Sequence, residues 1–392
     1  MSSIDSKGKL NRRTALKLAG IAAGSAVLPR PSRASGDRRS NCLRTRLSSE
    51  FDLRVPLASA GMAFVALPDL AAAVSNAGGI GVYGVGPEPP DVVRERIRAI
   101  KSSTSGVFGV DFIIANSPLG AFTTQAHIDT VVAARVPIVV FHFDLPLALW
   151  VSQLHAVGTT VWVQTGDVDV ARQAVAIGVD GIVAQGRSAG GHNKNSTIET
   201  IRLVKLMRRA LPAKIFILAS GGISDGKSLV RAIRAGADGG WAGTVFVAAT
   251  ESYANDGYKQ RLITGHSGNA TILTTRFGPE FPDAPQRVLR VRAAVEPVTT
   301  TPTQIGSTLL FPGVLNVPYP MPKYSAIVPT RDTTGDLEEM DMPAGSRSIK
   351  AVRAVRPAAA IVNDFIDQGR DACDDDDDDD DNDDDSDGSQ EE

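Results

Sequence analysis

The chain has 392 residues, of which 43% are hydrophobic and 22% are charged, an ordinary globular composition that can form a large buried core. The net charge of −3 conceals an asymmetry, because Asp371 to Glu392 contains 15 acidic residues and no Lys or Arg. Basic residues elsewhere are spread along the chain, which argues against a nucleic-acid-binding patch. We therefore expect no nucleic acid partner, and a disordered, solubilising acidic tail over residues 371–392.

Two cysteines, Cys42 and Cys373, flank the region that is expected to fold. They are too few for a Cys-rich zinc site or a disulfide framework. Their spacing allows a bridge between the two ends of the chain but does not require one.

The first 34 residues follow the order of an export signal. The pair Arg12-Arg13 precedes an apolar stretch from Leu16 to Leu28, and small residues follow. The pair resembles the twin-arginine type, although Ala15 stands where Phe is common, and an Arg- and Ser-rich transit peptide is the alternative. The apolar stretch is too short for stable insertion into a membrane. We expect export to the periplasm by the twin-arginine machinery, with a cytoplasmic or organellar location as the alternative.

From Phe51 onward, short apolar runs alternate with segments of helical periodicity, as in parallel β/α proteins. Eight such units favour a closed (β/α)8 TIM barrel over an open doubly wound sheet, since no Gly-x-Gly-x-x-Gly follows the first strand. The predicted strands are 55–60, 81–85, 107–114, 137–143, 159–164, 181–185, 214–219 and 239–247. The predicted helices are 67–77, 90–102, 125–134, 147–157, 168–177, 197–210 and 226–234.

Beyond residue 250 the pattern loosens into Pro- and Thr-rich segments. A last helix is predicted over 346–367, where Ala, Val and Ile form an apolar face that closes the barrel. The expected organisation is a signal peptide (1–34), a linker (35–50), an α/β barrel (51–250), a partly irregular cap (251–345), a closing helix (346–370) and the acidic tail (371–392).

In such barrels the active site is formed by loops at the carboxyl ends of the strands. Ser220-Gly221-Gly222 follows the seventh predicted strand, and Gly243-Thr244 belongs to the eighth. Glycines let backbone N–H groups approach a phosphate, and the loops after strands seven and eight are the usual phosphate site of this architecture. Two such loops at neighbouring strand ends favour a ligand that carries a phosphate.

His192 is the most informative of the five histidines. It follows a glycine-rich loop at a strand end, where a residue with a near-neutral pKa can act as a general base. His127 and His155 fall on predicted helices, and His266 lies in the loose region. His142 ends the fourth predicted strand and could also line the site.

Several separate motifs resemble the nitronate monooxygenase family. The resemblance extends from about Val55 to Ile366. The motifs are Leu67 to Gly79, Gln185-Gly186, Ala189-Gly190-Gly191-His192, Ser220-Gly221-Gly222-Ile223, Gly243-Thr244, Tyr324 to Thr330, Thr333 to Asp336 and Arg356-Pro357-Ala358.

The resemblance implies a barrel that binds FMN non-covalently and holds no metal. It also implies an enzyme that oxidises nitronates or nitroalkanes with O₂ to carbonyl compounds and nitrite. It implies that His192 abstracts the α-proton of a nitroalkane. The implied flavin contacts are Gly61 and Met62 at the ring, Asp111, Gln185, Gly186 and Gly190 beside the flavin, and Gly221, Gly222, Trp241, Ala242, Gly243 and Thr244 towards the phosphate.

The sequence departs from the family pattern at several of these positions. Asp111 stands where the family usually has Asn, and a carboxylate lacks the amide donor and disfavours the negative charge of reduced flavin. Ser188 replaces Glu, Trp241 replaces Gln and Val245 replaces Arg. Two alternatives therefore stay open: an FMN-dependent NAD(P)H reductase of the quinone or enoyl-ACP type, and a catalytically inactive flavin-binding protein.

Overall fold

The computed structural model describes residues 42–117, 120–193, 196–266, 268–282 and 284–374. The predicted signal peptide and residues 375–392 of the predicted tail lie outside this part of the chain. A barrel of eight parallel strands dominates the described residues. The strands are β1 (Leu57–Ser59), β2 (Gly81–Val85), β3 (Phe108–Ile114), β6 (Ile138–Phe143), β7 (Thr160–Thr165), β8 (Gly181–Gln185), β10 (Phe216–Ser220) and β11 (Gly239–Ala242).

The strands follow the order β1-β11-β10-β8-β7-β6-β3-β2. The two ends of this sheet meet, because Ser59 N–H donates to the carbonyl of Ile80 and Ile80 N–H donates to the carbonyl of Leu57, both at 2.9 Å. These bonds join β1 to the residue before β2 and bring the sheet round into a barrel. The predicted TIM barrel is confirmed.

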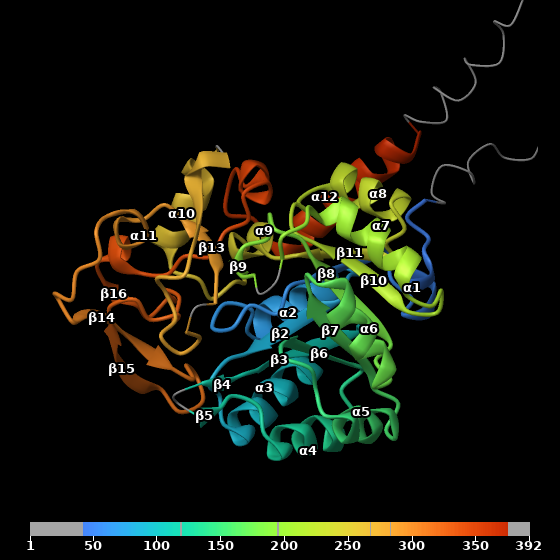
Figure 1. Cartoon of the computed structure of the whole chain (residues 1–392), viewed down its shortest axis with the longest axis horizontal. Coiled ribbons are helices and arrows are strands. Elements are labelled where there is room, and N and C mark those ends of the chain that lie inside the picture. The colour runs from blue at the N-terminus through green and yellow to red at the C-terminus, as the bar shows by residue number, and fades with distance from the viewer. Residues whose placement is uncertain (1–41, 118–119, 194–195, 267, 283, 375–392) are drawn as a thin grey trace, which may run out of the picture. The chain divides into compact units, whose positions relative to one another are not determined.

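Helices surround the strands, as Figure 1 shows. The helix α1 packs Leu47 against the apolar barrel interior, where Phe51 also contacts Trp162 and Phe216. Among the described residues, no helix is both long and apolar enough to cross a membrane. The helices are α1 (Arg46–Glu50), α2 (Pro68–Asn76), α3 (Pro90–Ser103), α4 (Gln125–Ala133), α5 (Ala148–His155), α6 (Val168–Ala176), α7 (Thr200–Ala210), α8 (Gly226–Arg234) and α12 (Ala358–Asp374).

The last helix, α12, packs between α8 and α2 and so completes the ring of helices. It begins at Ala358 rather than at residue 346, because Pro357 lacks an N–H group and would clash inside a helix. It also continues to Asp374, into the segment predicted as tail. Cys373 is buried there and forms a disulfide with Cys42, across a Cα–Cα distance of 6.1 Å.

The eighth strand is shorter than predicted. β11 ends at Ala242, and Thr244–Val247 form the short helix α9. Gly243 separates them with φ −107° and ψ −68°. The whole run from 244 to 247 is buried, so its hydrophobicity has no period that could distinguish a strand from a helical turn.

The cap contains two small antiparallel sheets. The first joins β12 (Thr271–Thr274), β13 (Gln286–Leu289) and β9 (Gly191–His192), so a barrel loop becomes part of the cap. The second joins β15 (Val317–Pro322), β14 (Gln304–Leu310) and β16 (Thr334–Gly335). The remaining elements beyond the barrel strands are β4 (Asn116–Ser117), β5 (Gly120–Ala121), α10 (Asp256–Thr264), α11 (Arg292–Val295), η1 (Gly268–Ala270), η2 (Leu337–Glu339) and η3 (Ser348–Ala351).

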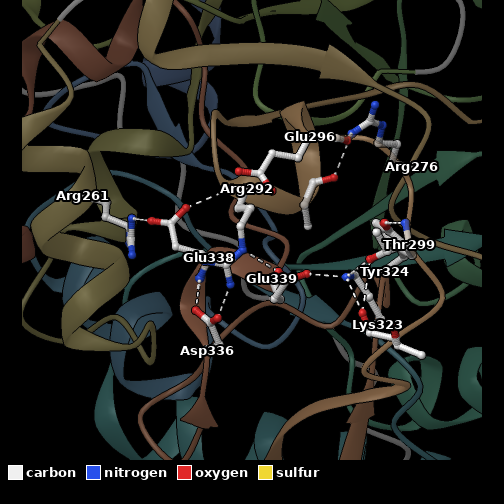
Figure 2. A network of polar contacts seen from close by, with 12 residues as sticks. Arg261, Arg276, Arg292, Glu296, Thr299, Lys323, Tyr324, Asp336, Glu338 and Glu339 are labelled. Carbon is white, nitrogen blue, oxygen red and sulfur yellow. Dashed lines mark hydrogen bonds and ion pairs between the residues drawn. The ribbon is translucent and has the colours of Figure 1, made fainter.

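A network of charged side chains connects the cap segments (Figure 2). Glu339 lies at its centre and contacts Lys323 Nζ at 2.9 Å and Arg292 Nε at 2.7 Å. The side chains of Lys323 and Glu339 are each only 8% exposed. Arg292 also pairs with Asp336, and its backbone N–H donates to Glu338 at 2.9 Å. The network ties α11 and η2 to the segment that follows β15.

Candidate active site

The barrel interior has two chemically different layers. Side chains alternate between the faces of a strand, so every second residue points inward. Trp162 and Leu218 are inward residues of an apolar layer. Two positions further along the same strands stand Gln164 and Ser220, which line a cavity. The polar strand residues that line this cavity are Asp111, His142, Gln164, Gln185 and Ser220.

A cavity of about 400 Å³ lies over this polar layer. Ligand sites commonly measure roughly 300–1,000 Å³. The barrel supplies the floor, and cap residues such as Phe281 and Gln286 supply another wall. The predicted site residues that line the cavity are His192, Gly61, Met62, Asp111, Gln185, Gly190, Gly221, Trp241, Gly243 and Thr244.

Three predicted cofactor residues do not line this cavity. Gly186 packs against the start of α7, where a Cβ at position 186 would lie 2.2 Å from Oγ1 of Thr200. Ala242 belongs to the core between the strands and the helices. Gly222 borders a second cavity of about 420 Å³, which shares Gly221 with the first. The glycine loop after β10 therefore lies between two cavities.

Glycine is required at two places in the cavity wall. Gly61 passes so close to Asp111 that a Cβ at position 61 would lie 2.3 Å from the Cβ of Asp111. Gly221 has φ of 100°, a left-handed conformation that residues with a Cβ rarely adopt. A side chain at either position would displace the neighbouring residue or strain the backbone.

His192 projects from β9 at the edge of the cap. Its ring lies between Phe143 and Phe281, with ring-centroid distances of 5.3 and 5.1 Å. Nε2 is buried and has no hydrogen-bond partner among the described residues. Burial lowers the pKa of His192 to about 4, so the imidazole is neutral at pH 7. A neutral ring with an unpartnered nitrogen is available to a ligand.

The cap supplies polar residues to the cavity that sequence reasoning missed. Gln286 is fully buried, and its side-chain amide lies beside the carboxyl group of Asp341. Burial raises the pKa of the Asp341 carboxyl well above its usual range, and the neighbouring amide of Gln286 opposes that shift. No periodicity or motif marks these two residues. By contrast, strand alternation could have identified Gln164 and Ser220.

The cavity fits a flavin. Gln185 Oε1 and His192 Nε2 are buried polar atoms without partners at its wall, as a ring with several hydrogen-bonding atoms requires. Phe143, Phe281 and Met62 supply apolar surface for the ring system. Within the described part of the chain, no three His, Cys, Asp or Glu side chains lie together so as to hold a metal ion.

This barrel and cavity place the chain in the class of flavin-dependent oxidoreductases, and the protein is an enzyme of that class. The match to known proteins is more specific. Residues 44–367 match the nitronate monooxygenase family, and the chain belongs to it.

Individual relatives are similar at modest identity. A nitronate monooxygenase of Paraburkholderia phytofirmans is 30% identical over 260 residues, which cover 56% of this chain and 70% of that protein. The structure of FabK from Thermotoga maritima is 29% identical with a TM-score of 0.69, covering 85% of this chain and 98% of that one. A nitroalkane oxidase from Streptomyces ansochromogenes is 26% identical with a TM-score of 0.67, covering 83% and 98%.

Proposed function

We propose that the protein is an FMN-dependent nitronate monooxygenase that uses O₂ to oxidise nitronates or nitroalkanes to carbonyl compounds and nitrite. The observation that carries this proposal is the environment of His192. A neutral imidazole, with Nε2 unpartnered among the described residues, lies between two aromatic rings at a cavity whose floor is polar. Bound FMN would supply an electron acceptor that O₂ can reoxidise.

The low pKa of His192 favours the nitronate over the neutral nitroalkane as substrate. A base whose conjugate acid has a pKa of about 4 draws a proton from carbon only weakly. A nitronate has already lost that proton, so it requires no base. For this substrate, His192 offers a neutral hydrogen-bonding group, and Phe143 and Phe281 exclude water around it.

The residues around the cavity suggest how FMN would be held. Gly61, Met62, Asp111 and Gln185 lie at the barrel floor, where the ring would bind. At the start of α9, Thr244 Oγ1 accepts a hydrogen bond from Gly345 N–H at 3.0 Å. The hydroxyl of Thr244 makes no donor bond to a described residue, so its proton is available to a phosphate.

An FMN-dependent NAD(P)H reductase is the second candidate. The similarity in fold to FabK from Thermotoga maritima, at 29% identity, favours keeping it. A catalytically inactive flavin-binding protein is the third, and the orphaned Nε2 of His192 argues against it. Export would also argue against a reductase, because NAD(P)H is not expected outside the cytoplasm.

Anaerobic absorbance spectroscopy of the purified protein tests these alternatives. We expect a flavin spectrum that bleaches when a nitronate is added and does not bleach with NADH or NADPH. Bleaching with NAD(P)H alone would establish the reductase. A flavin spectrum that neither the nitronate nor NAD(P)H bleaches would indicate a flavin-binding protein without either activity. If the protein holds no flavin after incubation with FMN, the cofactor assignment is wrong.

We also propose that the protein is exported through the twin-arginine machinery. The pair Arg12-Arg13 and the apolar stretch after it support export. The disulfide between Cys42 and Cys373 supports an oxidising compartment, because such bonds are rare in the cytosol. Fractionation with thiol labelling tests this: we expect periplasmic protein without free thiols, and full-length reduced protein confined to spheroplasts would contradict it.

A further inference from the structure

Asp111 is a carboxyl group buried at the floor of the cavity. It lies on β3, paired in register with Gly84 of β2 and Val140 of β6. Val140 belongs to the apolar barrel interior, so its neighbour Asp111 also points inward. The residue is 7% exposed, and a Cβ at Gly61 would lie 2.5 Å from its Oδ2. The carboxyl group is therefore held against backbone on one side and opens to the cavity on the other.

The surroundings of Asp111 provide no compensation for a negative charge. The carboxyl group forms no ion pair and no hydrogen bond with any described residue. The titratable groups on the neighbouring elements have no resolved influence on it, and burial alone raises its pKa well above the usual range. These groups are Tyr83 on β2, Glu88 after it, His142 on β6, Asp144 after it, and His192 across the cavity.

A buried carboxyl without a cation or donors takes up a proton, because leaving the charge unpaired costs more. The protonated group has one O–H donor and one carbonyl acceptor. An asparagine side chain at the same position also offers a donor and an acceptor. Protonated Asp111 can therefore both donate and accept a hydrogen bond, as the amide of an asparagine does. An ionised carboxylate can only accept.

We propose that Asp111 is held as a neutral carboxylic acid and donates its proton in a hydrogen bond to an acceptor atom of the isoalloxazine ring. This inference rests on the proposed binding of FMN. It makes Asp111 a residue that positions the flavin, with no part in proton transfer to substrate. It also replaces the expectation that a carboxylate at this position weakens the site.

Infrared difference spectroscopy tests the protonation state directly. The spectrum of Asp111→Asn, subtracted from that of the wild type at pH 7, should show the carbonyl stretch of one protonated carboxyl group. The subtraction removes the contributions of Glu88 and Asp341, two other buried carboxyls whose pKa burial raises. We expect the band of Asp111 to shift when FMN is added to wild-type apoprotein. Absence of the band, or a band that FMN leaves unmoved, would overturn the proposal.

FMN affinity provides a second measurement that does not depend on turnover. If Asp111 is neutral, Asp111→Asn should bind FMN within about threefold of the wild type at pH 7. If it is ionised, removing the charge should tighten binding about tenfold or more, the effect of roughly 1.4 kcal/mol. If neither protein binds FMN, the proposed function fails, whereas binding with the wrong infrared result contradicts only the role of Asp111. Asp111→Ser, which needs less space, replaces the Asn variant if that fails to fold.

Discussion

The side-chain amide of Gln185 donates a hydrogen bond to the backbone carbonyl of His192 at 2.9 Å. Gln185 is the last residue of β8, and His192 lies in β9, which pairs with the cap strand β13. The bond therefore fixes the loop that carries His192 to the barrel floor. Because Gln185 Oε1 has no partner among the described residues, the same side chain can also meet a ligand.

Gln185→Leu should lower turnover through the position of His192. The substitution leaves the His192 carbonyl without its donor, and losing such a buried bond costs about 1–3 kcal/mol. We expect kcat with a nitronate to fall by roughly tenfold or more, with an unchanged pH profile. Steady-state kinetics with Gln153→Ala, a change at the exposed surface, is the control. Equal kcat in Gln185→Leu and the wild type would show that the bond does not position His192.

His192→Ala should separate the two substrate classes. A positioned base contributes about 10²–10⁴-fold where a proton must be removed, and the low pKa of His192 places it at the lower end of this range, so turnover of a neutral nitroalkane should fall by about 10². Turnover of the nitronate should fall by less, because no proton is abstracted. The flavin should stay bound, as its absorbance will show. His155→Ala, on the outer helix α5, serves as the matched control. If His192→Ala loses the same fraction of turnover with both substrates, His192 does not act as a base.

The pH dependence of stability follows from the same residue. The folded pKa of His192, about 4, lies below its ordinary value of 6.5. Its contribution to stability is therefore present above about pH 6.5 and is lost as pH falls towards 4, because the unfolded chain binds the proton first. The loss is on the order of 3 kcal/mol. Tm measured between pH 7 and 4 should fall less steeply in His192→Ala than in the wild type, and parallel curves would contradict the low pKa.

The boundaries of several barrel elements could be predicted to the residue. Glycine starts β2, β8 and α8, and each is bounded as the short apolar runs and the helical periodicity indicated. Local patterns suffice there because β2 and β8 are buried on both faces, which gives a continuous apolar run, whereas α8 buries one regular face. Pro357 shows where local patterns fail. Apolar residues continue on both sides of it, but a proline disrupts the interior of a helix, so α12 begins only at Ala358.

The candidate site could be predicted only where the barrel forms it. His192 and the glycine loops follow regular strands, so their place at the carboxyl end could be inferred. Gln286 and Asp341 reach the same cavity from the cap, where strands are short and pairing is between segments distant in the chain. Gln286 and Asp341 come close to His192 only because distant segments of the chain fold together, and the local pattern of apolar and polar residues does not reveal this.

Asp111→Asn should stabilise the folded protein at neutral pH. The folded pKa of Asp111 is raised, so its contribution to stability is complete below the unfolded pKa near 3.8 and is lost as pH rises. Replacing the carboxyl by an amide that does not titrate should therefore raise the free energy of unfolding at pH 7, with little change near pH 4. Urea unfolding at both pH values measures this, and a gain confined to pH 4 would contradict the direction of the shift.

Glu339→Ala should destabilise the cap by removing the buried partner of Lys323. Exposed ion pairs contribute about 0–1 kcal/mol, and breaking a fully buried pair costs about 3–5 kcal/mol. Lys323 retains a hydrogen bond to Thr299 Oγ1 at 2.6 Å, and Arg292 retains Asp336, so we expect an intermediate loss of about 2 kcal/mol. Asp91→Ala, which breaks the exposed pair with Arg94, provides the comparison and should change stability by less than about 0.5 kcal/mol. Thermal unfolding of both variants gives the difference, and equal Tm values would mean that the buried pair contributes no more than the exposed one.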